Sequence, residues 1–146
     1  MLSSRWFRFF SWSAVILWAG TVFFLSSLSG NEVEKLNTMH WWDKALHFLA
    51  FSAGGAVVAY TLRRTRDWSA KKIVLVTTIV ISAYGWTDEW HQQWTPGRSA
   101  KDVGDWTADT LGGAAGAWLL VSLYARRSRS SAKDDTRVTN GRCAQE

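Results

Sequence analysis

Four long apolar stretches dominate this chain, and three of them reach the length of a membrane span only by including ionisable residues. These three cover 45–62, 73–90 and 107–124, each of eighteen residues. A helix rises about 1.5 Å per residue, so about 20 residues are needed to cross roughly 30 Å of hydrocarbon. The purely apolar cores of the last two, 73–86 and 111–124, have fourteen residues each and are too short. Because charges inside a membrane helix cost free energy, such residues usually have a partner or a function.

The composition agrees with a membrane protein that has polar ends. The chain has 47% hydrophobic residues, one proline and eleven tryptophans among 146 residues. The first apolar stretch, 11–28, has no charge on any face, whereas a surface helix of a soluble protein carries a polar stripe. Residues 27–29 resemble a signal-peptide cleavage site, so cleavage there stays open. Cleavage would leave the orientation of the other three helices unchanged.

The pattern predicts an all-α fold, an integral membrane four-helix bundle with short loops. The expected helices cover about 11–28, 44–63, 71–90 and 100–125. They form one domain, 1–125, and a disordered basic C-terminal tail, 126–146, is expected in the cytoplasm because it is rich in Arg, Ser, Lys and Asp. The only cysteine, Cys143, lies in that tail, which excludes an internal disulfide.

Charge orients the predicted bundle. With four spans, the N-terminus, the 63–72 loop and the tail share one side, which holds thirteen basic and four acidic residues. The other side holds four basic and eight acidic residues. The positive-inside rule therefore predicts a multi-pass protein of the cell (inner) membrane with both termini in the cytoplasm. We interpret the basic tail as a topology signal, so the expected partner is the lipid bilayer and not nucleic acid.

Polar side chains gather at the outer ends of the second and third expected helices. Spacings of three or four residues place those of the second helix on one face. Most of those on the third helix also share a face, with one carboxylate on the neighbouring strip. The residues are Asp43, Lys44 and His47 on the second helix and Asp88, Glu89, His91 and Gln92 on the third.

The turn after the third helix and the start of the fourth carry further candidates. The connection 94–98 contains Pro96-Gly97, which favours a turn, and it ends at Arg98. Ser99 then resembles a helix N-cap, with Asp102 at the third position. We therefore expect a guanidinium beside a helix N-terminus.

Three carboxylates follow on the fourth helix. Asp102, Asp105 and Asp109 are spaced i, i+3, i+7, which places them on one face that descends into the membrane. The first two also suit simple capping and compensation of the helix dipole. Asp109 lies inside a span whose length depends on it, so it is the stronger candidate. It also has a structural alternative, as a buried pair with His47 that holds the bundle together.

Small residues predict where the helices pack. Gly112-x-x-x-Gly116 allows close approach of a neighbouring helix, which we expect to be the second helix at 53–55. That contact would bring Asp109 towards His47, with the imidazole and acidic groups of the third helix close by. We therefore expect a polar site between the second, third and fourth helices.

These motifs together resemble a known family. They cover Asp43-Lys44-x-x-His47-Phe48-x-x-Phe51, then Asp88-Glu89-x-His91-Gln92-Gln93-x-x-Pro96-Gly97-Arg98-Ser99, then Asp102-Val103 followed by Asp109-Thr110-Leu111-Gly112-Gly113-x-x-Gly116, with Ser26-Ser27-x-Ser29-Gly30 after the first helix. In this order they resemble the VanZ-like family of small bacterial membrane proteins. The family takes its name from a member of a glycopeptide-resistance cluster associated with teicoplanin resistance. The resemblance implies a four-helix membrane fold and a cell-envelope role, whereas 104–106 lies outside the pattern.

Three classes of function remain open. The leading hypothesis is an outward-facing site that binds or modifies a ligand, such as the phosphate of a lipid-linked envelope precursor, held by Arg98 and free N–H groups of a helix start. The candidate ligand-binding residues are Asp43, Lys44, His47, Asp88, Glu89, His91, Gln92, Arg98, Asp102 and Asp109. A purely structural polar cluster without a ligand is another class.

The remaining class is enzymatic, a metal-dependent hydrolase acting on lipid phosphates. Imidazoles and carboxylates bind divalent ions such as Zn²⁺, and a remaining carboxylate can act as general base. The candidate metal ligands are His47, Glu89, His91 and Asp109. The sequence assigns no catalytic residue and no oligomeric state.

Overall fold

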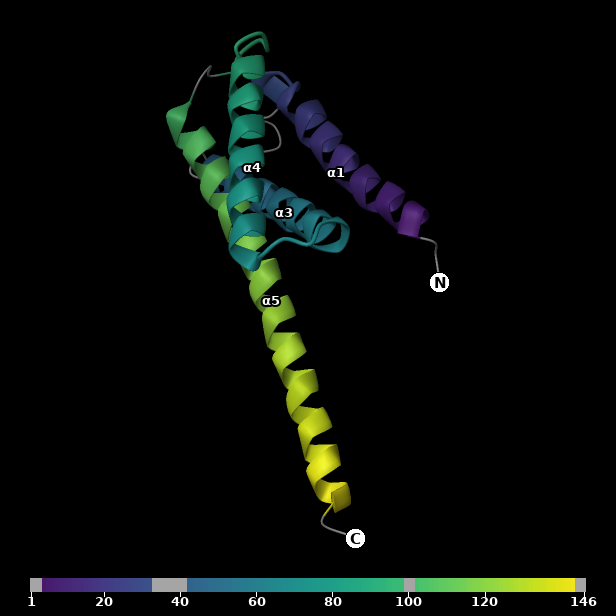
Figure 1. Ribbon diagram of the computed structural model, residues 1–146. Coiled ribbons are helices and arrows are strands. Elements are labelled where there is room, and N and C mark those ends of the chain that lie inside the picture. The colour runs from purple at the N-terminus through teal and green to yellow at the C-terminus, as the bar shows by residue number, and fades with distance from the viewer. Residues whose placement is uncertain (1–3, 33–41, 99–101, 144–146) are drawn as a thin grey trace.

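The computed structural model describes residues 4–32, 42–98 and 102–143, and it confirms an all-α fold (Figure 1). The long helices are α1 (Ser4–Ser26), α3 (Trp42–Thr65), α4 (Ala70–Gln92) and α5 (Val103–Cys143). No strand occurs within those described ranges. α1 therefore begins earlier than predicted and α5 begins later, while α3 and α4 extend about as expected.

The C-terminal part of α5 differs from the expected disordered tail. α5 is 41 residues long and continues as one helix to Cys143, away from the other helices (Figure 1). Residues 126–140 contain neither proline nor glycine, and Arg, Ala and Lys are good helix formers, so nothing in this segment ends the helix. High polarity alone indicated disorder, whereas helix propensity favours continuation.

α3 and α5 make the closest helix contact through glycines. A Cβ at Gly112 would collide with the backbone carbonyl of Phe48, and a Cβ at Gly116 would collide with that of Ser52. The two backbones can approach this closely only because neither glycine carries a side chain. The predicted packing of this glycine motif on the second long helix of the sequence is confirmed.

The partners on α3 are only partly those expected. Gly55 does face α5, where a Cβ would meet the carbonyl of Gly113. Gly54 faces α1 instead, against the indole of Trp18, and Ala53 is exposed. The contact is displaced by about one helical turn, towards Phe48 and Ser52.

The outer surface of the bundle is apolar. Large side chains stand exposed on several helices, among them Leu17 at 72% on α1, Leu75 at 60% on α4 and Trp118 at 62% on α5. Soluble monomers rarely expose large apolar surfaces, whereas these side chains are exposed on all four long helices. Two helices, over Arg5–Ser26 and Asp43–Thr65, are long and apolar enough to cross a membrane. These features indicate a protein surrounded by lipid.

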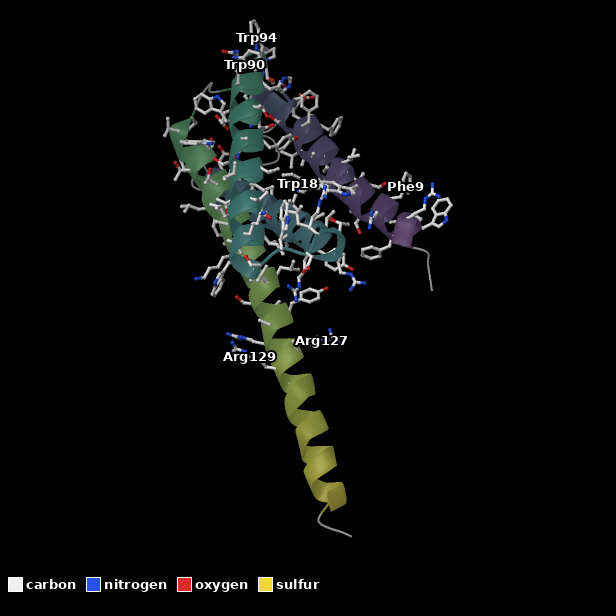
Figure 2. The ribbon with its side chains drawn as sticks, viewed as in Figure 1. Phe9, Trp18, Trp90, Trp94, Arg127 and Arg129 are labelled. Carbon is white, nitrogen blue, oxygen red and sulfur yellow. The ribbon has the colours of Figure 1, made fainter. Side chains whose placement is uncertain are left out.

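The two ends of the molecule differ in side-chain chemistry. Trp90 and Trp94 stand at one end, whereas Arg127 lies beyond the opposite end of the bundle (Figure 2). Both tryptophans are exposed, as expected of an interfacial belt. Trp106 has a different role: it donates its indole N–H to the Ser82 carbonyl at 3.1 Å, so it links α5 to α4.

Candidate functional site

His47 of α3 and Asp109 of α5 form the centre of the polar cluster. His47 Nδ1 lies 2.9 Å from Asp109 Oδ1, and the two side chains are 12% and 0% exposed. A carboxylate can only accept, so with Asp109 ionised Nδ1 carries the hydrogen and Nε2 is the free ring nitrogen. The approach of these two residues, predicted from the small-residue faces, is confirmed.

Glu89 joins this pair from α4. This residue is 1% exposed, and its Oε2 accepts the Asp102 backbone N–H at 2.9 Å. One ligand atom each of His47, Glu89 and Asp109 lie within 4.8 Å of one another. Three of the four residues predicted as metal ligands therefore converge from three helices, and His91 does not belong to this group.

Lys44 pairs with the two outer carboxylates of α5. Its Nζ lies 2.8 Å from Asp105 Oδ1 and 3.2 Å from Asp102 Oδ2. Asp105 is buried and Lys44 is exposed, so the ammonium covers the cluster on its solvent side. Lys44 therefore pairs with carboxylates at the start of α5 and not with its neighbours on α3.

Asp102 caps α5. Its Oδ1 accepts the Gly104 backbone N–H at 2.7 Å, and the helix begins at Val103. The helix thus begins three residues after the approximate start predicted at 100, and Ser99, the predicted cap, lies outside the described residues. Partial burial acts to raise the pKa of Asp102, but hydrogen bonds from Gly104 N–H and Lys44 outweigh it, so this pKa lies below its ordinary value.

A second chain of polar contacts runs from Asp88 through Gln92 to Arg98. Gln92 Nε2 donates to Asp88 Oδ2 at 3.2 Å. Arg98 donates to Gln92 Oε1 twice, from Nε at 3.2 Å and from Nη2 at 3.0 Å. Asp88 and Gln92 are both buried, so the guanidinium is held from the inside of the bundle.

The turn that carries Arg98 is fixed by the end of α1. Gly97 has φ of +73°, a backbone conformation that glycine adopts without strain, so the predicted Pro96-Gly97 pivot is confirmed. Gly30 N–H donates to the Pro96 carbonyl at 3.0 Å. A Cβ at Gly30 would collide with the Gly97 carbonyl. The segment after α1 therefore packs directly on the turn beside Arg98.

A cavity of about 270 Å³ lies beside this chain of contacts. Its wall combines apolar residues, which come mainly from α1 and α3, with polar residues from α1, α3, α4 and the turn that carries Arg98. The apolar residues are Val22, Leu25, Leu28, Leu46, Ala50 and Phe51, and the polar ones are Ser26, Asp43, His47, Asp88, Gln92 and Arg98. Five of the predicted ligand-binding residues thus line one cavity.

His91 lies apart from the cavity and from the His47 group. Its ring stacks on Phe23 with centroids 4.4 Å apart, and Nε2 lies 3.1 Å from Ser27 Oγ. These contacts tie the end of α4 to the end of α1. The expectation that His91 approaches Asp109 is wrong, because His91 points from α4 towards α1 whereas Glu89 points towards α5.

Sequence reasoning gave too little weight to three residues of the site. The sequence suggested that Asp105 mainly compensates the helix dipole, yet it is buried and paired with Lys44. Its spacing with Asp102 and Asp109 could have indicated that it belongs to the site. Ser26 lines the cavity. A Cβ at Gly85 would lie 2.8 Å from Asp109 Oδ2, so this glycine makes room for the carboxylate against α4.

Comparison with known proteins agrees with this architecture. The family model described as VanZ/LLP1 matches residues 7–124, which include the whole cavity and the His47 group. No curated protein and no solved structure matches the chain. The matched region covers most of the sequence, and its helices expose an apolar surface. The chain is a membrane protein and belongs to the VanZ family.

Proposed function

We propose that this protein binds the headgroup of a lipid phosphate in the 270 Å³ cavity, on the extracytoplasmic side of the membrane. The observation that carries this proposal is the mixed wall of the cavity, which combines six apolar residues with six polar ones, Arg98 among them. Ligand pockets for whole small molecules usually measure about 300–1,000 Å³. This cavity therefore suits a headgroup and its first carbons, with the remaining chain lying along the apolar outside of the helices.

Arg98 supplies the anion-binding group. A guanidinium has five N–H donors, and the two contacts with Gln92 Oε1 use one on Nε and one on Nη2. Three donors remain for a ligand. Because Gln92 fixes the plane of the group, a phosphate could be bound by two parallel hydrogen bonds at little further ordering cost.

The carboxylates of the cavity narrow the choice of headgroup. Asp43 and Asp88 line the same cavity, and both would repel a bare phosphate while accepting hydrogen bonds from hydroxyl or amine groups. The ligand we propose therefore carries a phosphate together with such donors. A lipid-linked sugar precursor of the cell envelope has this chemistry, and the family's association with teicoplanin resistance agrees with an envelope role.

The orientation that we propose follows from charge. The end of the bundle opposite Trp90 carries Arg63 and Arg64, whose guanidinium groups lie over the Tyr124 and Phe7 rings. Positive residues flanking spans favour the cytoplasm. We therefore propose a multi-pass inner-membrane protein with both termini in the cytoplasm and the cavity facing outward.

Binding of a radiolabelled isoprenoid phosphate to purified protein tests this function, with the corresponding isoprenoid alcohol as the matched ligand. We expect the phosphate to bind at least tenfold more tightly than the alcohol, and Arg98→Lys to abolish that preference because an ammonium lacks the planar fork. Arg129→Lys, on the exposed extension of α5, serves as control. Equal affinity for both lipids, or an unchanged preference in Arg98→Lys, would refute the proposal.

A second candidate function is hydrolysis of the same kind of lipid phosphate. The observation that favours it is the convergence of His47, Glu89 and Asp109 beside the cavity that His47 lines. Release of inorganic phosphate from the isoprenoid phosphate, in the presence of divalent ions, distinguishes an enzyme from a binding protein. Turnover that disappears in His47→Gln would establish it, and binding without turnover would reject it.

A further inference from the structure

We propose that His47, Glu89 and Asp109 bind one divalent transition-metal ion, as a site separate from the Arg98 anion site. The three residues come from α3, α4 and α5 respectively, and one ligand atom of each lies within 4.8 Å of the others. An ion at the centre of such a group would be within bonding reach after small side-chain adjustments. The proposal does not depend on the lipid ligand.

Two unsatisfied carboxylate oxygens point to a ligand. Glu89 Oε1 and Asp109 Oδ2 are buried and have no hydrogen-bond partner among the described residues, although the two side chains are only 1% and 0% exposed. Buried polar atoms without partners are costly and rare in folded proteins. Both oxygens belong to the same three-residue group, so one cation could satisfy both.

The charge of this group also favours a cation. Two carboxylates lie here with one imidazole, and Lys44, the nearby ammonium, is already paired with Asp102 and Asp105. Two like charges in a poorly hydrated interior repel each other strongly. A divalent ion would neutralise both carboxylates, whereas His47 could at most neutralise one.

The contacts of the other carboxylate oxygens define how an ion would fit. Glu89 Oε2 accepts the Asp102 N–H at 2.9 Å, which fixes this carboxyl group, and Asp109 Oδ1 lies 2.9 Å from His47 Nδ1. An ion shared by His47 and Asp109 would replace the hydrogen between these two atoms, because Nε2 lies on the far side of the ring and points away from Asp109. One nitrogen and two oxygen ligands suit Zn²⁺ or Mn²⁺, with further positions left for water or substrate.

A neighbouring group is a weaker candidate and provides controls. Ligand atoms of Asp43, His47 and Asp105 also lie within 4.8 Å of one another, but Asp105 is paired with Lys44 at 2.8 Å. Asp43 is not among the buried residues. Asp43→Asn should therefore leave metal binding intact, and so should His91→Gln, because His91 contacts Phe23 and Ser27 instead.

Metal content and binding of the purified full chain test the proposal. Protein stripped with EDTA and reloaded with Zn²⁺ or Mn²⁺ should hold one ion per chain after gel filtration and melt at a higher temperature than the stripped form. Glu89→Gln, Asp109→Asn and His47→Gln keep side-chain size, and each should weaken binding at least tenfold. Tryptophan fluorescence of each variant verifies folding before binding is measured.

The outcomes separate this site from the lipid site. Arg98→Lys should retain the ion even if it loses the lipid phosphate. Failure of the wild-type chain to retain a stoichiometric ion would overturn the metal site without affecting the proposed lipid binding. Retention of the ion by all three cluster variants, or its loss in Asp43→Asn or His91→Gln, would also overturn it. A Co²⁺-loaded sample whose visible spectrum changes in His47→Gln would support direct ligation by the imidazole.

Discussion

Asp109 holds His47 at 2.9 Å where α3 and α5 pack closely through glycine. Gly112, one turn after Asp109, contacts the backbone of Phe48, the residue after His47. The hydrogen-bonded pair and the glycine contact therefore depend on each other, because separation of the two helices would break both. This arrangement couples the geometry of the site to the packing of the bundle.

The first prediction separates a functional pair from a structural one. Asp109→Asn and His47→Gln keep hydrogen-bonding groups but change charge. We expect each to weaken metal or ligand binding at least tenfold, while expression and the melting temperature of the metal-free protein change little, corresponding to about 1 kcal/mol or less if one hydrogen bond is kept. Complementation of a deletion strain measures activity and thermal melting measures stability. Normal activity in both variants would favour the purely structural interpretation of the cluster.

The second prediction concerns helix packing. Gly116→Ala places a Cβ against the Ser52 carbonyl, so the helices must move apart, at a cost of about 1–3 kcal/mol typical of overpacking. Gly20→Ala on α1 is the matched control, because a Cβ there meets nothing within 4 Å and alanine favours helix by about 1 kcal/mol. Thermal melting in detergent should fall for the first variant and stay level or rise for the second. Equal melting of both would contradict the close α3–α5 contact.

The third prediction follows from the lowered pKa of Asp102. A carboxyl group with a lowered pKa stabilises the folded state above its unfolded pKa, about 3.9, and this contribution is lost as pH falls through the lower folded value. Between pH 7 and 5 the pair with Lys44 should therefore contribute constantly, and the loss should occur below about pH 4. Melting curves of wild type and Asp102→Asn should converge there. A difference that disappears already near pH 6 would assign the effect to another group.

Much of the site could be predicted from local spacing. Asp109 and His47 were placed together because each lies on a face with small residues, and such faces determine which helices touch. The position and orientation of the Arg98 guanidinium could not be predicted in this way. It depends on Gln92 and on the contact of Gly30 with the Pro96-Gly97 turn, which joins segments far apart in the sequence.

Two other differences between the sequence predictions and the structure also have physical reasons. His91 was expected close to Asp109, but stacking on Phe23 turns the imidazole towards α1. The helical continuation of α5 arises from residues that are polar and also good helix formers, and polarity alone does not distinguish such a helix from a disordered tail.

The final prediction concerns orientation. A reporter fused after Arg127 should be active in the cytoplasm, and one inserted near Asn37, which lies outside the described residues, should report the outside. Thirteen basic residues on the predicted inner side, against four on the outer side, are the physical reason.

Cys143, the only cysteine of the chain, gives an independent measurement of the same orientation. A membrane-impermeant thiol reagent should label it only after the cells are broken, and a Cys143→Ser chain supplies the background. Labelling in intact cells would show that the topology is the opposite of the one predicted. The Arg98 cavity and the His47 group would then face the cytosol, because Glu89 and Arg98 are close in sequence to Trp90 and Trp94, which stand at the end of the bundle opposite Arg127 (Figure 2). An extracytoplasmic lipid precursor would be excluded as ligand, whereas metal binding by His47, Glu89 and Asp109 would be unaffected.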